Sequence, residues 1–149
     1  MPLETKVALI TGGNRGIGLA TARLFASNGA RVVLFARNHA TLAAAAREIP
    51  NAHFVAGDVT RGQDCERAVN ATLRACSRLD ILINGAGIIY RHRTVEQMSE
   101  EEWDATFDTN VKGAFLMSKF AKFALSSVFP RVPLPIGRVR NRLRGRGDY

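Results

Sequence analysis

A glycine-rich loop with the sequence TGGNRGIG occupies residues 11–18, directly after the first apolar run of the chain. Glycine allows a tight turn and lacks the Cβ atom that would hold a phosphate group away from the backbone. In a loop that leads from a strand into a helix, this composition favours binding of a dinucleotide pyrophosphate at the helix N-terminus. The loop residues that we expect to bind a dinucleotide are Gly12, Asn14, Arg15, Gly16, Ile17 and Gly18.

The end of the second apolar run, residues 31–36, indicates which dinucleotide binds. Proteins that bind NAD generally place an acidic residue here to hold the ribose hydroxyls, whereas a 2′-phosphate repels an acid and is bound by arginine. This run ends in Ala36 and Arg37, and Arg15 lies in the glycine-rich loop. Two guanidinium groups that converge on one phosphate favour NADP(H) over NAD(H). Arg37 also argues against a methyltransferase that uses S-adenosylmethionine, because such enzymes tolerate similar glycine spacing but usually carry an acid there.

Apolar runs alternate with helical patterns along the chain, which is typical of βαβ units around a parallel sheet. Asn38 is predicted to cap the second helix, and Gly29 to end the first. Ser99 and Glu102 form a predicted capping box at the start of the last helix. We therefore expect an α/β fold with a doubly wound, Rossmann-type parallel sheet. Strands are predicted over residues 6–11, 31–36, 52–56 and 79–84, and helices over residues 16–28, 40–49, 62–76 and 100–125.

The last predicted helix is apolar on more than one face. Such a helix usually covers a sheet on one side and meets another surface on the other. We expect that second surface to be another copy of the chain, so that the protein forms a homo-oligomer through residues 100–125. The apolar residues concerned are Trp103, Phe107, Val111, Phe115, Leu116, Phe120 and Phe123.

The net charge of +8 is concentrated at the end of the chain. Residues 126–149 contain six Arg and one Asp, whereas residues 1–125 contain 15 Lys and Arg and 12 Asp and Glu. The last segment lacks interleaved aromatic residues, so we expect no nucleic-acid binding.

We divide the chain into an NADP(H)-binding domain, residues 1–125, and an irregular tail rich in Arg, Pro and Gly, residues 126–149. A change of reading frame, a truncated gene and a splice variant each explain this break, and sequencing beyond codon 149 distinguishes them.

The two cysteines and the apolar runs indicate the compartment. Cys65 and Cys76 lie on one predicted helix, roughly 16 Å apart at 1.5 Å per residue, whereas a disulfide needs Cα atoms within about 7 Å. We therefore expect no disulfide between them. No CxxC motif or His cluster indicates a metal site. The apolar runs are too short to span a membrane, and the first residues lack the pattern of a signal peptide. We expect a cytoplasmic protein without membrane contact.

Four motifs, in order across residues 6–125, resemble those of the short-chain dehydrogenases/reductases. The loop TGGNRGIG fits the TGxxxGxG pattern of that family, and residues 57–59 (GDV) are similar to its adenine contact. Residues 84–87 (NGAG) are similar to its NNAG segment, with Gly85 in place of the second Asn. Residues 110–113 (NVKG) resemble the segment that carries its helix-kinking Asn. The further cofactor-binding residues that this resemblance implies are Arg37, Asp58, Val59, Asn84, Ala86 and Gly87.

The resemblance implies a sheet ordered 3-2-1-4 and hydride transfer between NADP(H) and a small ketone or alcohol. In the family, four residues carry the chemistry: Ser, Asn, Tyr and a Lys four residues after the Tyr. The Lys is needed because a phenol with a pKa of about 10 serves near neutral pH only beside an ammonium group. Only Asn110 of these four is present: Thr94 stands four residues after Tyr90, and Tyr149 is the last residue.

The chain therefore resembles the first half of the family fold, truncated before the fifth strand. An unpaired apolar edge such as residues 79–83 (LDILI) invites aggregation. We expect a short-chain oxidoreductase by descent whose chain as written is inactive. The alternative is a nucleotide-binding module without chemistry.

Overall fold

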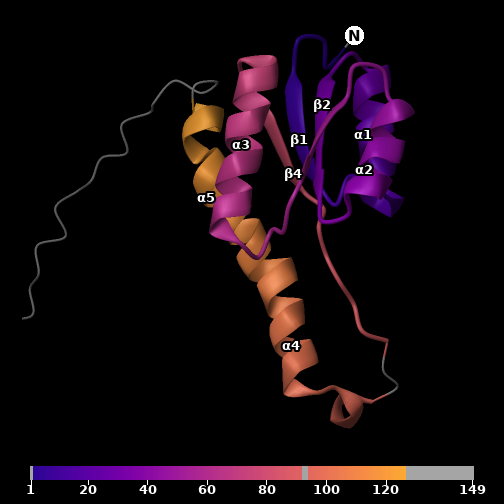
Figure 1. Ribbon diagram of the computed structural model, residues 1–149, viewed down its shortest axis with the longest axis vertical. Coiled ribbons are helices and arrows are strands. Elements are labelled where there is room, and N and C mark those ends of the chain that lie inside the picture. Colours follow the sequence, from indigo (N-terminus) through magenta and orange to yellow (C-terminus); the bar gives the residue numbers. More distant parts are fainter. Residues whose placement is uncertain (1, 92–93, 127–149) are drawn as a thin grey trace, which may run out of the picture.

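A four-stranded parallel sheet forms the centre of the fold, with the strand order β3-β2-β1-β4 (Figure 1). The structure, a computed structural model, describes residues 2–91 and 94–126. The predicted tail lies outside the described residues apart from Ser126, which ends the last helix. The predicted strand order and α/β class are confirmed. The strands are β1 (Val7–Thr11), β2 (Arg31–Ala36), β3 (His53–Ala56) and β4 (Ile81–Asn84).

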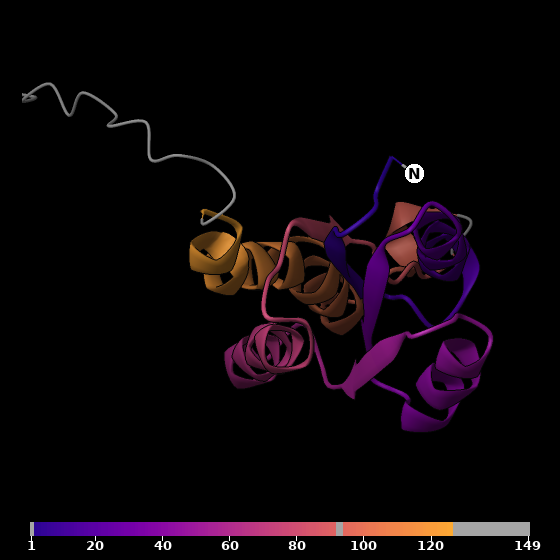
Figure 2. The ribbon, with the colours of Figure 1, turned by 90° about the horizontal axis from the view of Figure 1, so that it is seen from above.

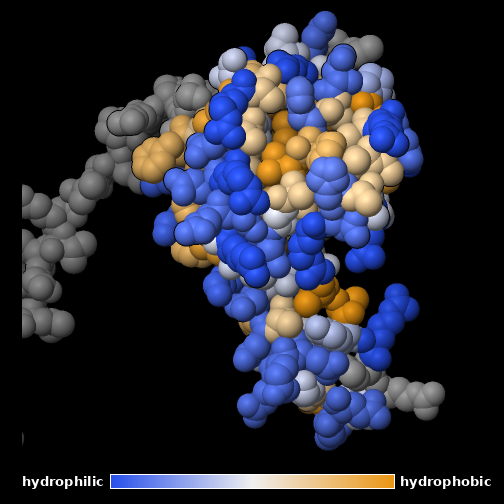
Figure 3. Space-filling model, in the orientation of Figure 1, coloured by the Kyte–Doolittle hydropathy of each residue, from blue (hydrophilic) through white to orange (hydrophobic). Residues whose placement is uncertain are grey.

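Helices cover both faces of the sheet (Figure 2). Helices α1 (Gly16–Ser27) and α2 (His39–Arg47) lie on one face, and α3 (Gly62–Cys76) and α5 (Gly113–Ser126) lie on the other. Successive residues of a strand point to opposite faces, so β1 contributes Ala8 and Ile10 to one core and Val7 and Leu9 to the other. Burial on both faces explains why the strands read as continuous apolar runs. In Figure 3, hydrophobic surface gathers between the two helical layers, where the sheet reaches the surface.

Three predicted helix boundaries are made by the residues expected to make them. The Asn38 side chain accepts a hydrogen bond from the backbone N–H of Thr41. Ser99 and Glu102 form both bonds of the capping box at the start of α4 (Glu100–Phe107). Gly29 follows α1 with a φ of 94°, which lies in the region that favours glycine.

The start of β4 lies two residues later than predicted because Asp80 binds β1 through its side chain. The Asp80 carboxylate accepts from the backbone N–H of Val7 at 2.9 Å, and the Asp80 N–H donates to the Val7 carbonyl. Burial alone would raise the pKa of Asp80, but hydrogen bonds from Arg78 and Val7 and the charges of Arg78 and Lys6 outweigh it and lower that pKa. In the part of the chain that the structure describes, β4 pairs only with β1.

The long helix predicted over residues 100–125 is divided by a π-helical segment, η2 (Asp108–Lys112), between α4 and α5. Its apolar residues divide between two faces, as predicted. Leu116 and Phe120 pack against the core on the α3 side. Trp103, Phe107, Val111, Phe115 and Phe123 are exposed.

Cys65 and Cys76 are both buried, free thiols on α3. Burial raises the pKa of Cys65 to about 11 and also raises the pKa of Cys76, so both favour the unreactive thiol form. No helix among residues 2–91 and 94–126 is long and apolar enough to cross a membrane. In the same residues, no group of three His, Cys, Asp or Glu side chains is placed to hold a metal ion.

Candidate functional site

A groove of about 490 Å³ lies where the carboxyl ends of the four strands meet the following loops. Ligands of open parallel sheets bind at this edge, next to the point where the strand order reverses, here between β1 and β4. The structure brings all the predicted cofactor-binding residues except Asn84 to this groove. They are Gly12, Asn14, Arg15, Gly16, Ile17, Gly18, Arg37, Asp58, Val59, Ala86 and Gly87.

The glycines of the loop after β1 serve two different purposes. A Cβ atom on Gly18 would lie 2.3 Å from the Gly12 carbonyl oxygen, and one on Gly12 would lie 2.7 Å from the Gly85 carbonyl oxygen. These two glycines therefore let the loop, α1 and the segment after β4 pack closely together. A Cβ atom on Gly16 would meet nothing within 4 Å, and Gly16 has a φ of 54°. Gly16 thus leaves open space at the groove, as a phosphate approaching the backbone requires.

The N-terminus of α1 faces this open loop without a side-chain cap. Arg15 occupies the N-cap position and makes no capping bond, and the first turn contains no acidic residue. The first backbone N–H groups of a helix lack partners within the helix and carry partial positive charge. Together with Gly16, this end of α1 fits a diphosphate group.

Thr11 holds together two of the segments that line the groove, a role that was not predicted from the sequence. Its side chain is buried at the end of β1, and its Oγ1 accepts from the N–H groups of Gly85 and Ala86, both at 3.0 Å. The same hydroxyl donates to the Ile83 carbonyl at 3.3 Å. Thr11 therefore holds the segment after β4 against the glycine-rich loop. A polar residue at the end of a fully apolar strand was the signal that could have identified it.

Arg15 and Arg37 both line the groove, from the loops after β1 and β2. Both are exposed, and neither makes an ion pair within residues 2–91 and 94–126. No carboxylate stands at the end of β2, where Ala36 lines the groove. Two guanidinium groups thus face the groove without anionic partners from the described residues.

Asp58 is held in place by the loop between β3 and α3. Its Oδ1 accepts from the N–H and the hydroxyl of Thr60, both at 2.9 Å, and its own N–H donates to Asp64. That bond, together with Arg67 and Arg61, lowers the pKa of Asp64, although burial acts in the opposite direction. Arg67 also donates to the Ala56 carbonyl at 2.9 Å. The segment that presents Asp58 is therefore fixed at several points.

Asn110 joins the π-helical segment to the chain that follows β4. Its Oδ1 accepts from the Ile88 N–H at 2.8 Å, and its Nδ2 donates to the Ile88 carbonyl at 2.9 Å. The carboxamide therefore pairs with Ile88 as a neighbouring strand would. Thr109 and Ile88 line the groove, whereas Asn110 does not line it and acts on it through its two bonds to Ile88.

Asn84 is the predicted cofactor residue that does not line the groove. Its Nδ2 donates to Ser118 Oγ at 3.2 Å, so its side chain lies on the α5 side of the sheet and links β4 to that helix. Several further lining residues were not among the predicted cofactor-binding residues. They are Asn38, Thr41, Gly57, Gly85, Ile88 and Thr109. Gly57 and Gly85 belong to the GDV and NGAG motifs, whereas the others contact the groove through the fold rather than through a motif.

Comparison with known proteins agrees with this geometry. The family model for short chain dehydrogenase matches residues 6–126. An uncharacterized oxidoreductase of Thermotoga maritima is 40% identical over 125 residues, which is 81% of this chain and 49% of that protein. L-fucose dehydrogenase of Bos taurus is 35% identical over 116 residues, 78% of this chain and 43% of that protein.

A solved structure gives the same result. The crystal structure of 3-ketoacyl-(acyl-carrier-protein) reductase from Brucella melitensis, complexed with NADH, matches with a TM-score of 0.81 and 38% identity. The match covers 84% of this chain and 52% of that one. The chain thus spans about half the length of the relatives it matches. Because the family model matches residues 6–126, most of the chain, the chain belongs to the short-chain dehydrogenase family of oxidoreductases.

Proposed function

We propose that residues 1–125 form a domain that binds NADP(H) in preference to NAD(H). The observation that carries this proposal is the pair Arg15 and Arg37, which face the groove without anionic partners while Ala36 stands where an acid would hold a ribose diol. The preference rests on these residues and not on the fold, because the similar Brucella reductase is described with NADH.

The groove suggests how the dinucleotide is held. The N-terminus of α1 and Gly16 bind the diphosphate, and the guanidinium groups of Arg15 and Arg37 bind the 2′-phosphate. Asp58 and Val59 contact the adenine. Ala86 and Gly87 would lie beside the nicotinamide end, and Asn84 links β4 to α5 through Ser118. In a chain with the full set of catalytic residues, a bound nicotinamide would supply or accept a hydride.

For the chemistry, we propose that the chain descends from short-chain oxidoreductases that act on a small ketone or alcohol. Of the residues that the family uses, Asn110 is present, and it positions the chain after β4. The 149 residues contain no Tyr followed four residues later by Lys. We therefore propose that this chain binds cofactor without turning over substrate, with an inert nucleotide-binding module as the alternative. We place it in the cytoplasm, which fits its two free thiols and which cell fractionation would test.

Titration of the full chain with NADPH and NADH, followed by nucleotide fluorescence, tests the cofactor proposal. We expect NADPH to bind at least about tenfold more tightly, because charge-assisted hydrogen bonds to the 2′-phosphate are absent with NADH. Addition of salt should weaken NADPH binding more than NADH binding. Equal affinities for the two nucleotides would refute the preference.

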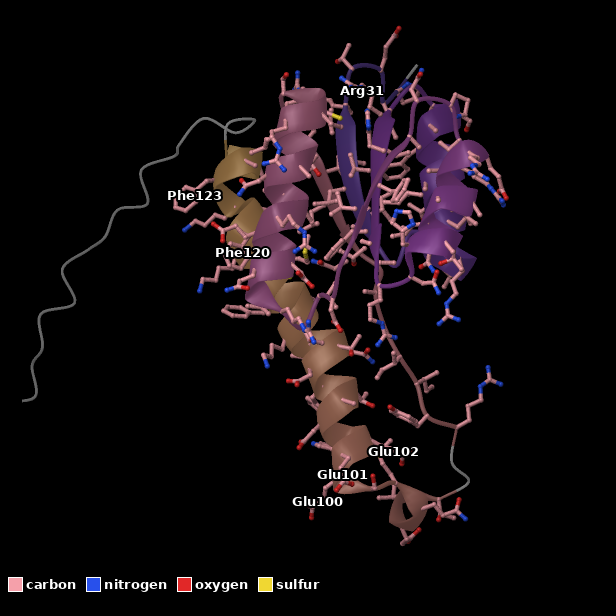
Figure 4. All side chains as sticks on the ribbon, in the orientation of Figure 1. Arg31, Glu100, Glu101, Glu102, Phe120 and Phe123 are labelled. Atoms are coloured by element: carbon pink, nitrogen blue, oxygen red, sulfur yellow. The ribbon has the colours of Figure 1, made fainter. Side chains whose placement is uncertain are left out.

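We also propose that the exposed face of α4 and α5 joins two copies of the chain. Trp103, Phe107, Val111, Phe115 and Phe123 lie exposed along it, with the rings of Trp103 and Phe107 4.5 Å apart. Figure 4 shows Glu100, Glu101 and Glu102 at one end of this helical pair and Phe120 and Phe123 at the other. Lys119 and Lys122 lie beside these two rings. An antiparallel pair of copies would therefore set the acidic end of one against the basic end of the other.

Phe115→Glu should convert the oligomer to a monomer, because it buries a charge in the middle of this apolar face. Sedimentation velocity of the full chain measures the change. Leu24→Glu is the matched control, because Leu24 and Phe115 are both 60% exposed but Leu24 lies on α1. A wild-type chain that sediments as a monomer, or a dimer that survives Phe115→Glu, would exclude this interface.

A further inference from the structure

A short hydrogen-bond chain connects the two loops that carry Arg15 and Arg37. The Asn14 Nδ2 donates to Thr41 Oγ1 at 2.9 Å, across 27 residues of sequence. The Thr41 hydroxyl in turn donates to the Asn38 carbonyl at 3.1 Å. The hydroxyl of Thr41 is therefore the link between the glycine-rich loop and the start of α2.

This link lies at the groove and next to both arginines. Asn14, Asn38 and Thr41 all line the groove, and Asn14 and Asn38 are the chain neighbours of Arg15 and Arg37. The backbone segments that carry the two guanidinium groups are already joined at their bases, where the Gly12 N–H donates to the Phe35 carbonyl at 2.8 Å. Beyond that bond, the Thr41 side chain links Asn14 to the start of α2. The ion pair between Arg23 and Glu48 does not involve Arg15 or Arg37.

We propose that Thr41 is a positioning residue that determines cofactor specificity. Its hydroxyl fixes the spacing of the two loops, so that both guanidinium groups reach the same 2′-phosphate. Arginine binds phosphate through a rigid fork of donors, and a small displacement of one loop therefore costs contacts to that group. NADH has a hydroxyl at this position and should be insensitive to the spacing. This inference rests on the preference for NADP(H) proposed above.

The helix-capping role of this region is separable from the proposed role. Asn38 caps α2 by accepting from the backbone N–H of Thr41 at 3.0 Å, and that bond does not involve the Thr41 hydroxyl. Thr41→Val keeps this N–H, the branched Cβ and nearly the same volume. Because Thr41 is exposed, the substitution removes only the link to Asn14 and the bond to the Asn38 carbonyl.

The experiment compares the full-length wild type, Thr41→Val and Thr41→Ser by titration with NADPH and NADH. Thr41→Val should weaken NADPH binding about three- to tenfold, the usual effect of one hydrogen bond. Its NADH affinity should change less than about twofold, and Thr41→Ser, which keeps the hydroxyl, should match the wild type for both nucleotides. Adding Asn14→Ala to Thr41→Val should weaken NADPH binding by less than the sum of the two single effects, because the two residues share one bond.

The wild-type titration separates this inference from the proposed function. If the wild type shows no preference for NADPH, the proposed function fails, and the role of Thr41 fails with it. If the preference is present but Thr41→Val weakens both nucleotides equally, or neither, only the role of Thr41 is overturned. Matching thermal unfolding midpoints for the three proteins show that the variants are folded. If Thr41→Val is unstable in the long titration, the affinities for 2′,5′-ADP, which carries the 2′-phosphate, and 5′-AMP, which lacks it, are compared instead.

Discussion

Replacing Ala36 with Asp and Arg37 with Ala in one chain should reverse the cofactor preference, so that NADH binds more tightly than NADPH. An aspartate at the end of β2 accepts hydrogen bonds from the two ribose hydroxyls and repels the 2′-phosphate, and removal of Arg37 takes away one cation. Each change is worth about 10- to 100-fold, so the ratio of the two dissociation constants should shift by about 10²–10⁴. Fluorescence titration of both proteins with both nucleotides measures this ratio.

The geometry of β2 makes this exchange feasible. Ala36 is the last residue of the strand, half-buried, and its carbonyl accepts from the Gly57 N–H at 2.9 Å, which holds the backbone in place while the side chain lines the groove. Arg47→Ala is the matched control, because Arg47 is exposed in the last turn of α2 and does not line the groove. It removes the same charge and should leave the ratio unchanged. A double variant that still prefers NADPH would show that these two positions do not control specificity.

Much of the fold follows from local sequence patterns. The strand over residues 31–36 has the predicted bounds because a continuous apolar run defines it. The helix over residues 62–76 has the predicted bounds because its apolar residues recur at helical spacing. The second helix ends at Arg47 instead of Ile49. Glu48 and Ile49 donate to Ala45 and Ala46 in a tighter final turn. Pro50 disfavours helical backbone at the residue before it, which explains the early end.

The parts of the site that escaped prediction depend on contacts between distant residues. Thr11 binds Gly85 across 74 residues and Thr41 binds Asn14 across 27 residues, and neither pairing leaves a periodic signal in the sequence. The apolar spacing of residues 100–125 reads as one continuous helix, and only the family resemblance indicated a kink at Asn110, where the structure has a π-helical segment. The Asn110 side chain in this segment binds Ile88, 22 residues away in the sequence. By contrast, the places of the glycine-rich loop and Arg37 at the groove could be predicted, because residue type and local spacing indicate them.

The full 149-residue chain should show no carbonyl-dependent oxidation of NADPH. Reduction of a carbonyl requires a proton at the oxygen as the hydride arrives, and a positioned general acid contributes about 10²–10⁴-fold to such a step. The chain offers two tyrosines, and neither is followed four residues later by Lys: Thr94 stands at that distance from Tyr90. Asn110 cannot supply the proton, because a carboxamide is not an acid near neutral pH, and its carboxamide is bound to Ile88. The loss of nicotinamide absorbance with a panel of aldehydes and ketones measures the rate.

Inactivity is meaningful only for a chain that binds its cofactor, so the same preparation is first titrated with NADPH. A protein that binds NADPH but reduces no carbonyl above a blank without protein supports the role proposed for this chain. Turnover above that blank would contradict it. In that event Tyr90→Phe identifies the acid, because Tyr90 follows the Ile88 segment that lines the groove and is 38% exposed. A rate lost in Tyr90→Phe would assign the proton to this phenol. An unchanged rate would show that a group other than Tyr90 donates the proton.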